Sequence, residues 1–258
     1  MVTQREVSLP LPTRSLSVKS LVTAPQGSKA PVIAGVSFEL LAGDGLGILG
    51  PSGSGKSSLA RALVGVWPSL AGDIRFDGAV LPHYQSTQLG EMVGYLPQRV
   101  ELFDGTVAEN IARFRPDASS EAIIDAANAA GVHSLVSSMP DGYSSRVGEQ
   151  GDLLSAGQRQ RIGLARALYG NPFLIVLDEP NANLDSDGDN ALTEAIHQAR
   201  SRGSIVIVIA HRPSAIAAID KVLFVQAGRQ VAFGPKAEVL QQIMQSGGNV
   251  RPMKVPGA

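Results

Sequence analysis

The feature that most constrains this 258-residue chain is a glycine-rich octapeptide at residues 50–57. It reads Gly-Pro-Ser-Gly-Ser-Gly-Lys-Ser and fits the pattern G-x-x-x-x-G-K-[ST] at every fixed position. Glycines let the backbone curl so that successive N–H groups point at the oxygens of a bound phosphate. An apolar run at residues 46–50 comes before the loop, and a helical stretch follows from Lys56. A strand, a loop and a helix in this order predict a nucleotide-phosphate site.

The octapeptide also predicts which groups bind the ligand and its metal. The Lys56 ammonium is expected to reach the β- and γ-phosphates of ATP, and the Ser57 hydroxyl to ligate Mg²⁺. The expected ATP contacts comprise the whole loop and the residue after it, namely Gly50, Pro51, Ser52, Gly53, Ser54, Gly55, Lys56, Ser57 and Ser58.

A second charged site follows the apolar run at residues 173–177, which ends in Asp178 and Glu179. A strand buried on both faces does not end in two carboxylates without a partner, because uncompensated charge beside a core is costly. Mg²⁺ is the natural partner. We expect Asp178 to hold the ion and Glu179 to orient and deprotonate the attacking water.

The order of apolar segments predicts an α/β fold. Alternating apolar residues between residues 16 and 40 indicate antiparallel strands. Short apolar strands are predicted at 46–50, 73–76, 93–96, 173–177 and 205–210, with a strand and turn near 222–233. Helices are predicted at 56–64, 119–130, 155–168 and 189–200. The result is a parallel α/β core that a helical lobe at about 104–165 interrupts.

Composition excludes several classes of protein. The chain contains no cysteine, which rules out a disulfide framework and favours a reducing compartment. The formal net charge of -1 gives no field that attracts nucleic acid, so none is expected as a partner. No window approaches the roughly 18 apolar residues that a membrane span needs.

Residues 154–158 separate this chain from other nucleotide-binding α/β proteins. They read Leu154, Ser155, Ala156, Gly157 and Gln158, and Arg-Gln-Arg follows. Ser155 and Gln158 form an S-x-x-Q capping box, so Ser155 is expected to begin a helix whose N-terminus attracts an anion. The pentapeptide resembles the L-S-G-G-Q signature of ABC (ATP-binding cassette) ATPases. The resemblance implies that this anion is the γ-phosphate held by a second subunit.

Other ABC motifs occur in the same order as in the family. Gln98 matches the Q-loop glutamine, Asp185 after Leu184 matches the D-loop, and His211 matches the switch histidine that contacts the γ-phosphate. The resemblance covers residues 16 to 240 and implies a P-loop NTPase (RecA-like) core with an N-terminal antiparallel β-subdomain. It implies the catalytic set Glu179, His211 and Gln98, and the Mg²⁺ ligands Ser57, Gln98 and Asp178.

Two features are similar to exporters. Residues 147–151, Val-Gly-Glu-Gln-Gly, resemble the x-loop that precedes the signature in exporters. Residues 94–98, 102–106, 108–114, 157–169 and 177–185 resemble type I protein-secretion exporters, of the kind that exports proteases and lipases. The resemblance implies ATP-driven export of an unfolded protein, an ATP-dependent homodimer, and a transmembrane domain of its own or fused to it. A periplasmic adaptor, an outer-membrane channel and a place on the cytoplasmic face of the inner membrane are implied as well.

The expected domain organisation follows from this resemblance. Residues 1–15 are expected to be a linker from a membrane domain missing from this chain, 16–245 the ATPase domain, and 246–258 a disordered tail. Two positions differ from the family. Exporters carry an adenine-stacking aromatic about 25 residues before the phosphate loop, where this chain has Ala24 and no aromatic between residues 17 and 36. Ala156 replaces a signature glycine, and it accepts helical φ.

The sequence is also consistent with other functions of ABC ATPases. The chain could be the ATPase subunit of an importer or of a small-molecule exporter. A soluble ABC ATPase outside transport is a further alternative, although the interval from Lys56 to Ser155 has no sustained heptads of the kind that DNA-repair members carry.

Overall fold

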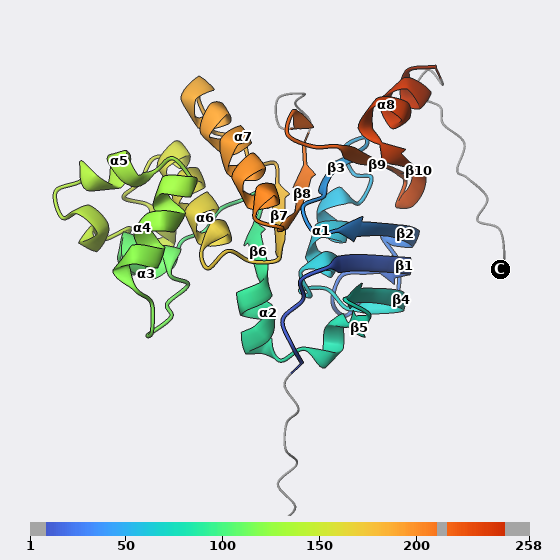
Figure 1. Ribbon diagram of the computed structural model, residues 1–258, viewed down its shortest axis with the longest axis horizontal. Coiled ribbons are helices and arrows are strands. Elements are labelled where there is room, and N and C mark those ends of the chain that lie inside the picture. The colour runs from blue at the N-terminus through green and yellow to red at the C-terminus, as the bar shows by residue number, and fades with distance from the viewer. Residues whose placement is uncertain (1–8, 211–215, 246–258) are drawn as a thin grey trace, which may run out of the picture.

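The computed structural model describes residues 9–210 and 216–245 (Figure 1). The first eight residues of the predicted linker, the predicted tail 246–258 and His211 lie outside the described residues. The described strands form two sheets, one of four strands in the order β2-β1-β4-β5 and one of six in the order β10-β9-β3-β8-β7-β6. The predicted α/β class is confirmed.

The four-stranded sheet is antiparallel, as the alternating pattern predicts. It contains β1 (Ser15–Thr23), β2 (Ile33–Leu41), β4 (Ser69–Phe76) and the short β5 (Ala79–Val80). In β1 and β2, Leu16 pairs with Leu40 and Val18 with Phe38, and all four side chains are buried. The apolar residues of the pattern therefore lie on one face of the sheet.

The six-stranded sheet is the core that carries the phosphate loop. Its parallel strands are β3 (Gly45–Leu49), β6 (Val93–Leu96), β7 (Leu174–Asp178), β8 (Ile205–Ile209) and β9 (Lys221–Gln226). The edge strand β10 (Arg229–Pro235) is antiparallel to β9. Every residue of β7 and β8 is buried, which explains their continuous apolar sequence. The carboxyl ends of the five parallel strands meet at one edge of the sheet.

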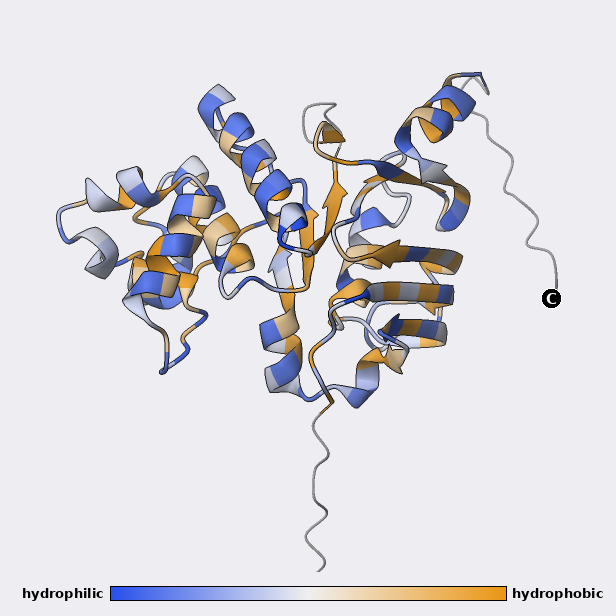
Figure 2. Cartoon of the chain, viewed as in Figure 1, coloured by the Kyte–Doolittle hydropathy of each residue, from blue (hydrophilic) through white to orange (hydrophobic). Residues whose placement is uncertain are grey.

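Alternate residues of β7 belong to two different cores. Leu174 and Val176 pack in the cluster that contains the antiparallel sheet and α1 (Lys56–Leu63). Ile175 and Leu177 pack in the cluster that contains the helical lobe and α7 (Ser186–Ser201). The central sheet therefore separates two apolar layers, and Figure 2 shows its strands as a hydrophobic band between more polar elements.

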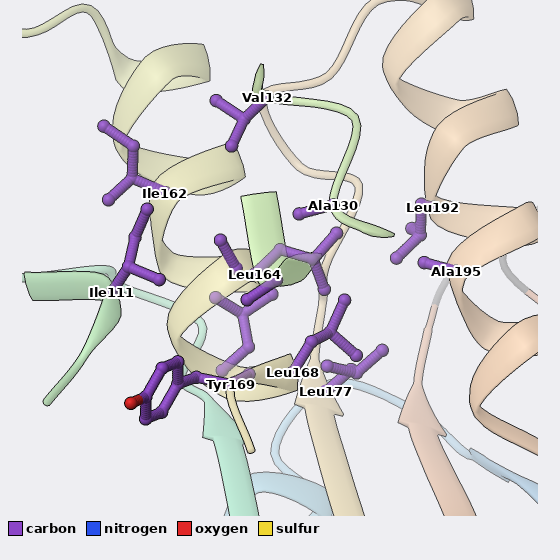
Figure 3. Close-up of a cluster of buried hydrophobic side chains, with 14 of the residues drawn as sticks. Ile111, Ala130, Val132, Ile162, Leu164, Leu168, Tyr169, Leu177, Leu192 and Ala195 are labelled. Carbon is purple, nitrogen blue, oxygen red and sulfur yellow. The ribbon is translucent and has the colours of Figure 1, made fainter. Parts of the chain in front are cut away.

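The helical lobe lies beside the central sheet and consists of α3 (Val107–Ile111), α4 (Ser120–Ala129), α5 (His133–Ser137) and α6 (Ala156–Leu168) (Figure 1). Its core surrounds α6, whose Ile162, Leu164 and Leu168 are buried among side chains of the other helices (Figure 3). The remaining described α-helices are α2 (Ser86–Met92) and α8 (Lys236–Gln245). Among the described residues, no helix is both long and apolar enough for a membrane crossing.

The segment before β1 is fixed to the antiparallel sheet by one carboxylate. Backbone N–H groups of Thr13, Arg14 and Ser15 all donate to the Asp77 carboxylate, at 2.7 to 3.1 Å. Burial opposes ionisation of Asp77, but these three donors lower its pKa below the usual value. Gln88 in α2 donates to the carbonyl of Leu9 as well.

Arg113 joins the helical lobe to the core by hydrogen bonds to backbone carbonyls. Its guanidinium donates to the carbonyls of Gly90 and Val93 near the start of β6, and to three carbonyls around the end of α6, those of Arg166, Ala167 and Tyr169. Burial lowers its pKa to about 10, with a smaller contribution from the charge of Arg166.

Replacing Arg113 by methionine should lower the free energy of unfolding by about 1–3 kcal/mol, because several half-buried carbonyls lose their donors. Arg115→Met is the matched control. Arg115 pairs with Glu91 and Asp117 on the surface, where an ion pair contributes less than about 1 kcal/mol. Urea unfolding followed by circular dichroism measures both variants. Equal losses for the two variants would contradict the assignment of Arg113 as the buried link.

Candidate functional site

The phosphate loop connects β3 to α1, as predicted. Gly55 is the N-cap of α1 with φ of 96°, in the left-handed region, and a Cβ there would lie 2.7 Å from Ile33 Cδ1. Glycine at this position therefore satisfies both the backbone conformation and the close packing. The loop delivers the first N–H groups of α1 to whatever binds above it.

Lys56 is buried in this loop. Its Nζ donates to the carbonyls of Gly50 and Pro51, at 2.9 Å each. Burial lowers the pKa of Lys56, while the nearby charges of Glu179 and Asp178 raise it. The ammonium thus lies inside the curl of the loop, with two carboxylates nearby. The Ser54 hydroxyl in the same loop is also buried, and it has no hydrogen-bond partner among the described residues.

Asp178 ends β7 with only 1% of its surface exposed. Its side chain shares a hydrogen bond with Ser57, but its Oδ1 is buried without a partner among the described residues. Burial raises its pKa above the usual value, and the neighbouring Glu179 adds to this rise. A buried carboxylate oxygen beside a serine hydroxyl is the hard oxygen donor set that suits Mg²⁺. These residues fit the predicted ion.

Glu179 follows in the left-handed region, with φ of 52°. Such a conformation costs free energy for a residue with a side chain, and it occurs mainly where the surroundings impose it. The Glu179 N–H donates to the Ile209 carbonyl of β8, at 2.9 Å. The backbone therefore turns away from the sheet at this residue.

One cavity brings the predicted residues of three separate segments together. It is lined by Val32, residues 52–58 of the phosphate loop, Gln98 and Glu179. Its volume is about 280 Å³ and it opens to solvent. Of the residues predicted to contact ATP, Gly50 and Pro51 are not part of this lining, but both hold the Lys56 ammonium.

The signature pentapeptide lies at the start of α6, outside the phosphate-loop cavity. Ser155 is the N-cap of α6, its hydroxyl accepts from the Gln158 N–H, and the Gln158 side chain accepts from the Ser155 N–H. The predicted capping box is confirmed, and Ala156 begins the helix in an exposed position. Residues 154–158 do not line the cavity of the phosphate loop. The helix end is thus available to a ligand that another molecule holds.

Asp185 caps α7 by accepting from the Gly188 N–H at 2.8 Å, and this bond lowers its pKa. Its carboxylate also pairs with Arg161 of α6. Arg161 contacts Asp185, and the buried Gln160 contacts Pro180 next to Glu179. The sequence predicts no role for either residue. Their only sequence signal is that they follow the signature directly.

Ala24 is 1% exposed, directly after β1. No aromatic side chain lines the described part of the phosphate-loop cavity. The position predicted to correspond to an adenine-stacking ring is therefore buried. The predicted switch residue His211 cannot be placed, because it lies outside the described residues.

Comparisons with known proteins agree with this geometry. Residues 33–182 match the ABC transporter family. The type I secretion system ATP-binding protein PrsD of Rhizobium meliloti is 55% identical over 239 residues, which are 93% of this chain and 41% of that protein. The ATP-dependent lipid A-core flippase of Chromobacterium violaceum is 36% identical, over 91% of this chain and 40% of its own length.

The structure of a bacterial Atm1-family ABC exporter with ATP bound is also similar. Its TM-score is 0.83 at 33% identity, and the match covers 91% of this chain and 41% of that one. This chain spans about two fifths of the length of these three relatives.

Proposed function

The chain belongs to the ABC transporter family, and from that premise we propose that it binds and hydrolyses ATP to drive export across a membrane. The observation that carries the proposal is the convergence of the phosphate loop, Gln98 and Glu179 on one cavity beside the buried Asp178. These segments are far apart in sequence, and a phosphate loop alone would not explain why the two others meet it.

Each residue has a distinct part in the proposed hydrolysis. Lys56 and the loop N–H groups bind the β- and γ-phosphates, and His211 contacts the γ-phosphate. Ser57, Asp178 and Gln98 would hold Mg²⁺, which supplies charge neutralisation on the phosphates when bound. Glu179 orients the attacking water and accepts its proton.

The active unit is proposed to be a homodimer closed by ATP. The N-terminus of α6 carries free N–H groups and a positive dipole end, and it lies outside the cavity of its own chain. In a twofold pair, Ser155 of each copy would face the phosphate held at Lys56 of the other. The interface would be isologous, with the nucleotide between the two surfaces.

The transported cargo is proposed to be an unfolded protein, in type I secretion. The support is the 55% identity to a type I secretion system ATP-binding protein, against 36% to a lipid A-core flippase. The proposal places the domain on the cytoplasmic face of the inner membrane. Its partners would be a fused or separate transmembrane domain, a periplasmic adaptor and an outer-membrane channel.

A domain exchange tests the cargo class. Residues 16–245 of this chain replace the matching region of the Rhizobium meliloti relative, and the protein that the type I system releases into the medium is measured. We expect secretion from the exchange and none from the same exchange with Lys56→Ala. An exchange that hydrolyses ATP at the normal rate but releases no protein would favour another transporter class, such as a small-molecule exporter or an importer.

A second measurement concerns the base of the nucleotide. With Ala24 buried and no ring on the described cavity wall, the domain lacks a stacking contribution of roughly 1–3 kcal/mol. GTP should therefore compete with a labelled ATP analogue almost as well as ATP does. A preference for ATP beyond about a hundredfold would mean that an aromatic side chain contacts the base after all.

A further inference from the structure

A buried glutamine of α6, the helix that begins at the signature, holds the turn at residues 179–182. We call this turn, which contains Glu179, the catalytic turn. Gln160 in α6 is 2% exposed, and its Nε2 donates to the carbonyl of Pro180 at 2.9 Å. Pro180 directly follows Glu179. Because proline has no N–H group, this carbonyl is the only backbone group through which residue 180 can be held by a hydrogen bond.

The conformation of the turn needs external support. Glu179 lies at φ of 52°, which is unfavourable for a residue with a Cβ. Its own N–H is held by Ile209 of β8, and its carbonyl accepts from the Ala182 N–H at 3.2 Å. The Gln160 carboxamide adds a contact from α6 in the helical lobe. It fixes the peptide between Pro180 and Asn181, one residue beyond Glu179, and so helps to hold the turn that directs the Glu179 side chain.

Two further contacts join α6 to the same loop. Arg161 pairs with Asp185 at the end of the loop. In the first turn of α6, a Cβ built at Gly157 would lie 3.1 Å from the Asn183 carbonyl, so helix and loop are in close contact there. The first six residues of α6 therefore touch residues 180–185 at three separate points.

The N-terminus of α6 and these contacts belong to one continuous helix. The helix runs unbroken from Ala156 to Leu168, and Gln160 is only five residues from the capping Ser155. Because the backbone hydrogen bonds of a helix join successive turns, a displacement or rotation at Ser155 would also displace the turn that carries Gln160. The carboxamide of Gln160 would be displaced with it.

We propose that Gln160 is a positioning residue for Glu179. When the N-terminus of α6 binds a phosphate, the helix would shift and so change the position of Glu179 in the same chain. This inference rests on the proposed function, since it needs a second copy that presents ATP to Ser155. A subunit that engages its partner's nucleotide would thereby align its own Glu179. Each site would reach full activity only after the other site has filled.

The first test uses Gln160→Met, which keeps the length of the side chain and removes the donor. We expect kcat for ATP to fall about tenfold or more, while KM and the ATP-dependent dimer stay within about twofold of wild type. Gln198→Met is the control, because Gln198 is exposed on α7 and its side-chain amide donates to Glu194 one turn away on the same helix. A role in folding alone would lower the amount of ATP-dependent dimer in proportion to kcat, whereas a positioning role lowers kcat and leaves the dimer unchanged.

The second test asks which of the two sites slows. A trace of Gln160→Met is mixed with excess Glu179→Gln, so that the only active Glu179 lies in the chain that lacks Gln160. In the converse mixture, a trace of wild type meets excess Gln160→Met/Glu179→Gln. A trace of wild type with excess Glu179→Gln is the reference. We expect slow turnover in the first mixture and reference turnover in the second.

Equal turnover in the two mixtures, whether fast or slow, would overturn the proposal. If Gln160→Met does not fold, Gln160→Asn replaces it, because asparagine keeps the carboxamide but withdraws it by one methylene. The same comparison then applies. Failure of the proposed function has a different signature, since the wild-type chain itself would then show no ATP hydrolysis.

Discussion

We expect Lys56→Ala to abolish detectable ATP hydrolysis by this chain. The Lys56 ammonium lies inside the phosphate loop, within reach of the charges of Asp178 and Glu179. The ligand brings several negative charges into the same space, and no other described lysine is near enough to balance them. Loss of this contact removes binding of the β- and γ-phosphates and the charge that stabilises the transition state.

A steady-state phosphate-release assay at saturating ATP measures the effect. Lys236→Ala is a matched control, because the Lys236 ammonium also donates to two backbone carbonyls, those of Ile216 and Ala217. Both variants lose a lysine held by carbonyls, but only one loses a phosphate contact. Wild-type activity in Lys56→Ala, or equal inactivation of both variants, would show that the loop is not the catalytic site.

Glu179→Gln slows hydrolysis by roughly 10²–10⁴-fold, the range for losing a general base. The amide occupies the same volume and leaves the phosphate contacts of Lys56 in place. Because ATP is then bound but not consumed, the ATP-closed dimer should accumulate. Light scattering should find monomers without nucleotide and dimers of the variant in ATP.

The dimer interface is tested by Ser155→Arg in the Glu179→Gln background. The arginine removes the cap of α6 and places bulk at the helix end that should meet the partner's γ-phosphate, so the dimer should be lost. Ser119→Arg is the control, since Ser119 is exposed and caps α4 in the same way by accepting from the Ala122 N–H. A dimer that survives Ser155→Arg, or that forms equally well without ATP, would contradict the proposal that the two copies share the γ-phosphate.

Elements with strong local signals could be predicted from sequence. Strands β7 and β8 are continuous apolar runs, and the capping box at Ser155 spans four residues, so each is determined by neighbouring residues. All three predictions agree with the structure to within one residue. The start of α7 was predicted at Asp189, whereas the helix begins at Ser186. The Asp185 side chain caps the helix there, a local signal that the apolar pattern alone does not contain.

Helix α8 was missed although its sequence carried a weak signal. Pro235 precedes it, and Val239 and Ile243 are spaced as on one helix face. Helices α2, α3 and α5 were missed because they have only seven, five and five residues, too few for a period to be seen. Short elements of this kind are fixed by the packing around them rather than by their own propensity.

The candidate site was predictable where chemistry lies in contiguous residues. Lys56, Asp178 and Glu179 could be proposed from motifs, and the structure brings all three to one place. The contacts of Gln160 with Pro180 and of Arg113 with five carbonyls could not be predicted. Each joins residues 20 or more positions apart and depends on how layers pack, which no local pattern encodes.

The carboxylate of Asp77 has a mechanical consequence. A pull along residues 9–14 loads the bond from Gln88 to the Leu9 carbonyl and then the three N–H bonds to Asp77. From there the tension passes into β1 and its neighbours β2 and β4, whose ladders run along its length and resist it in shear. The sheet that bears this load is not the sheet that holds the phosphate loop. The two are nevertheless in contact, because Ile33 of β2 packs against Gly55, so tension in the antiparallel sheet would reach the nucleotide cavity through that contact.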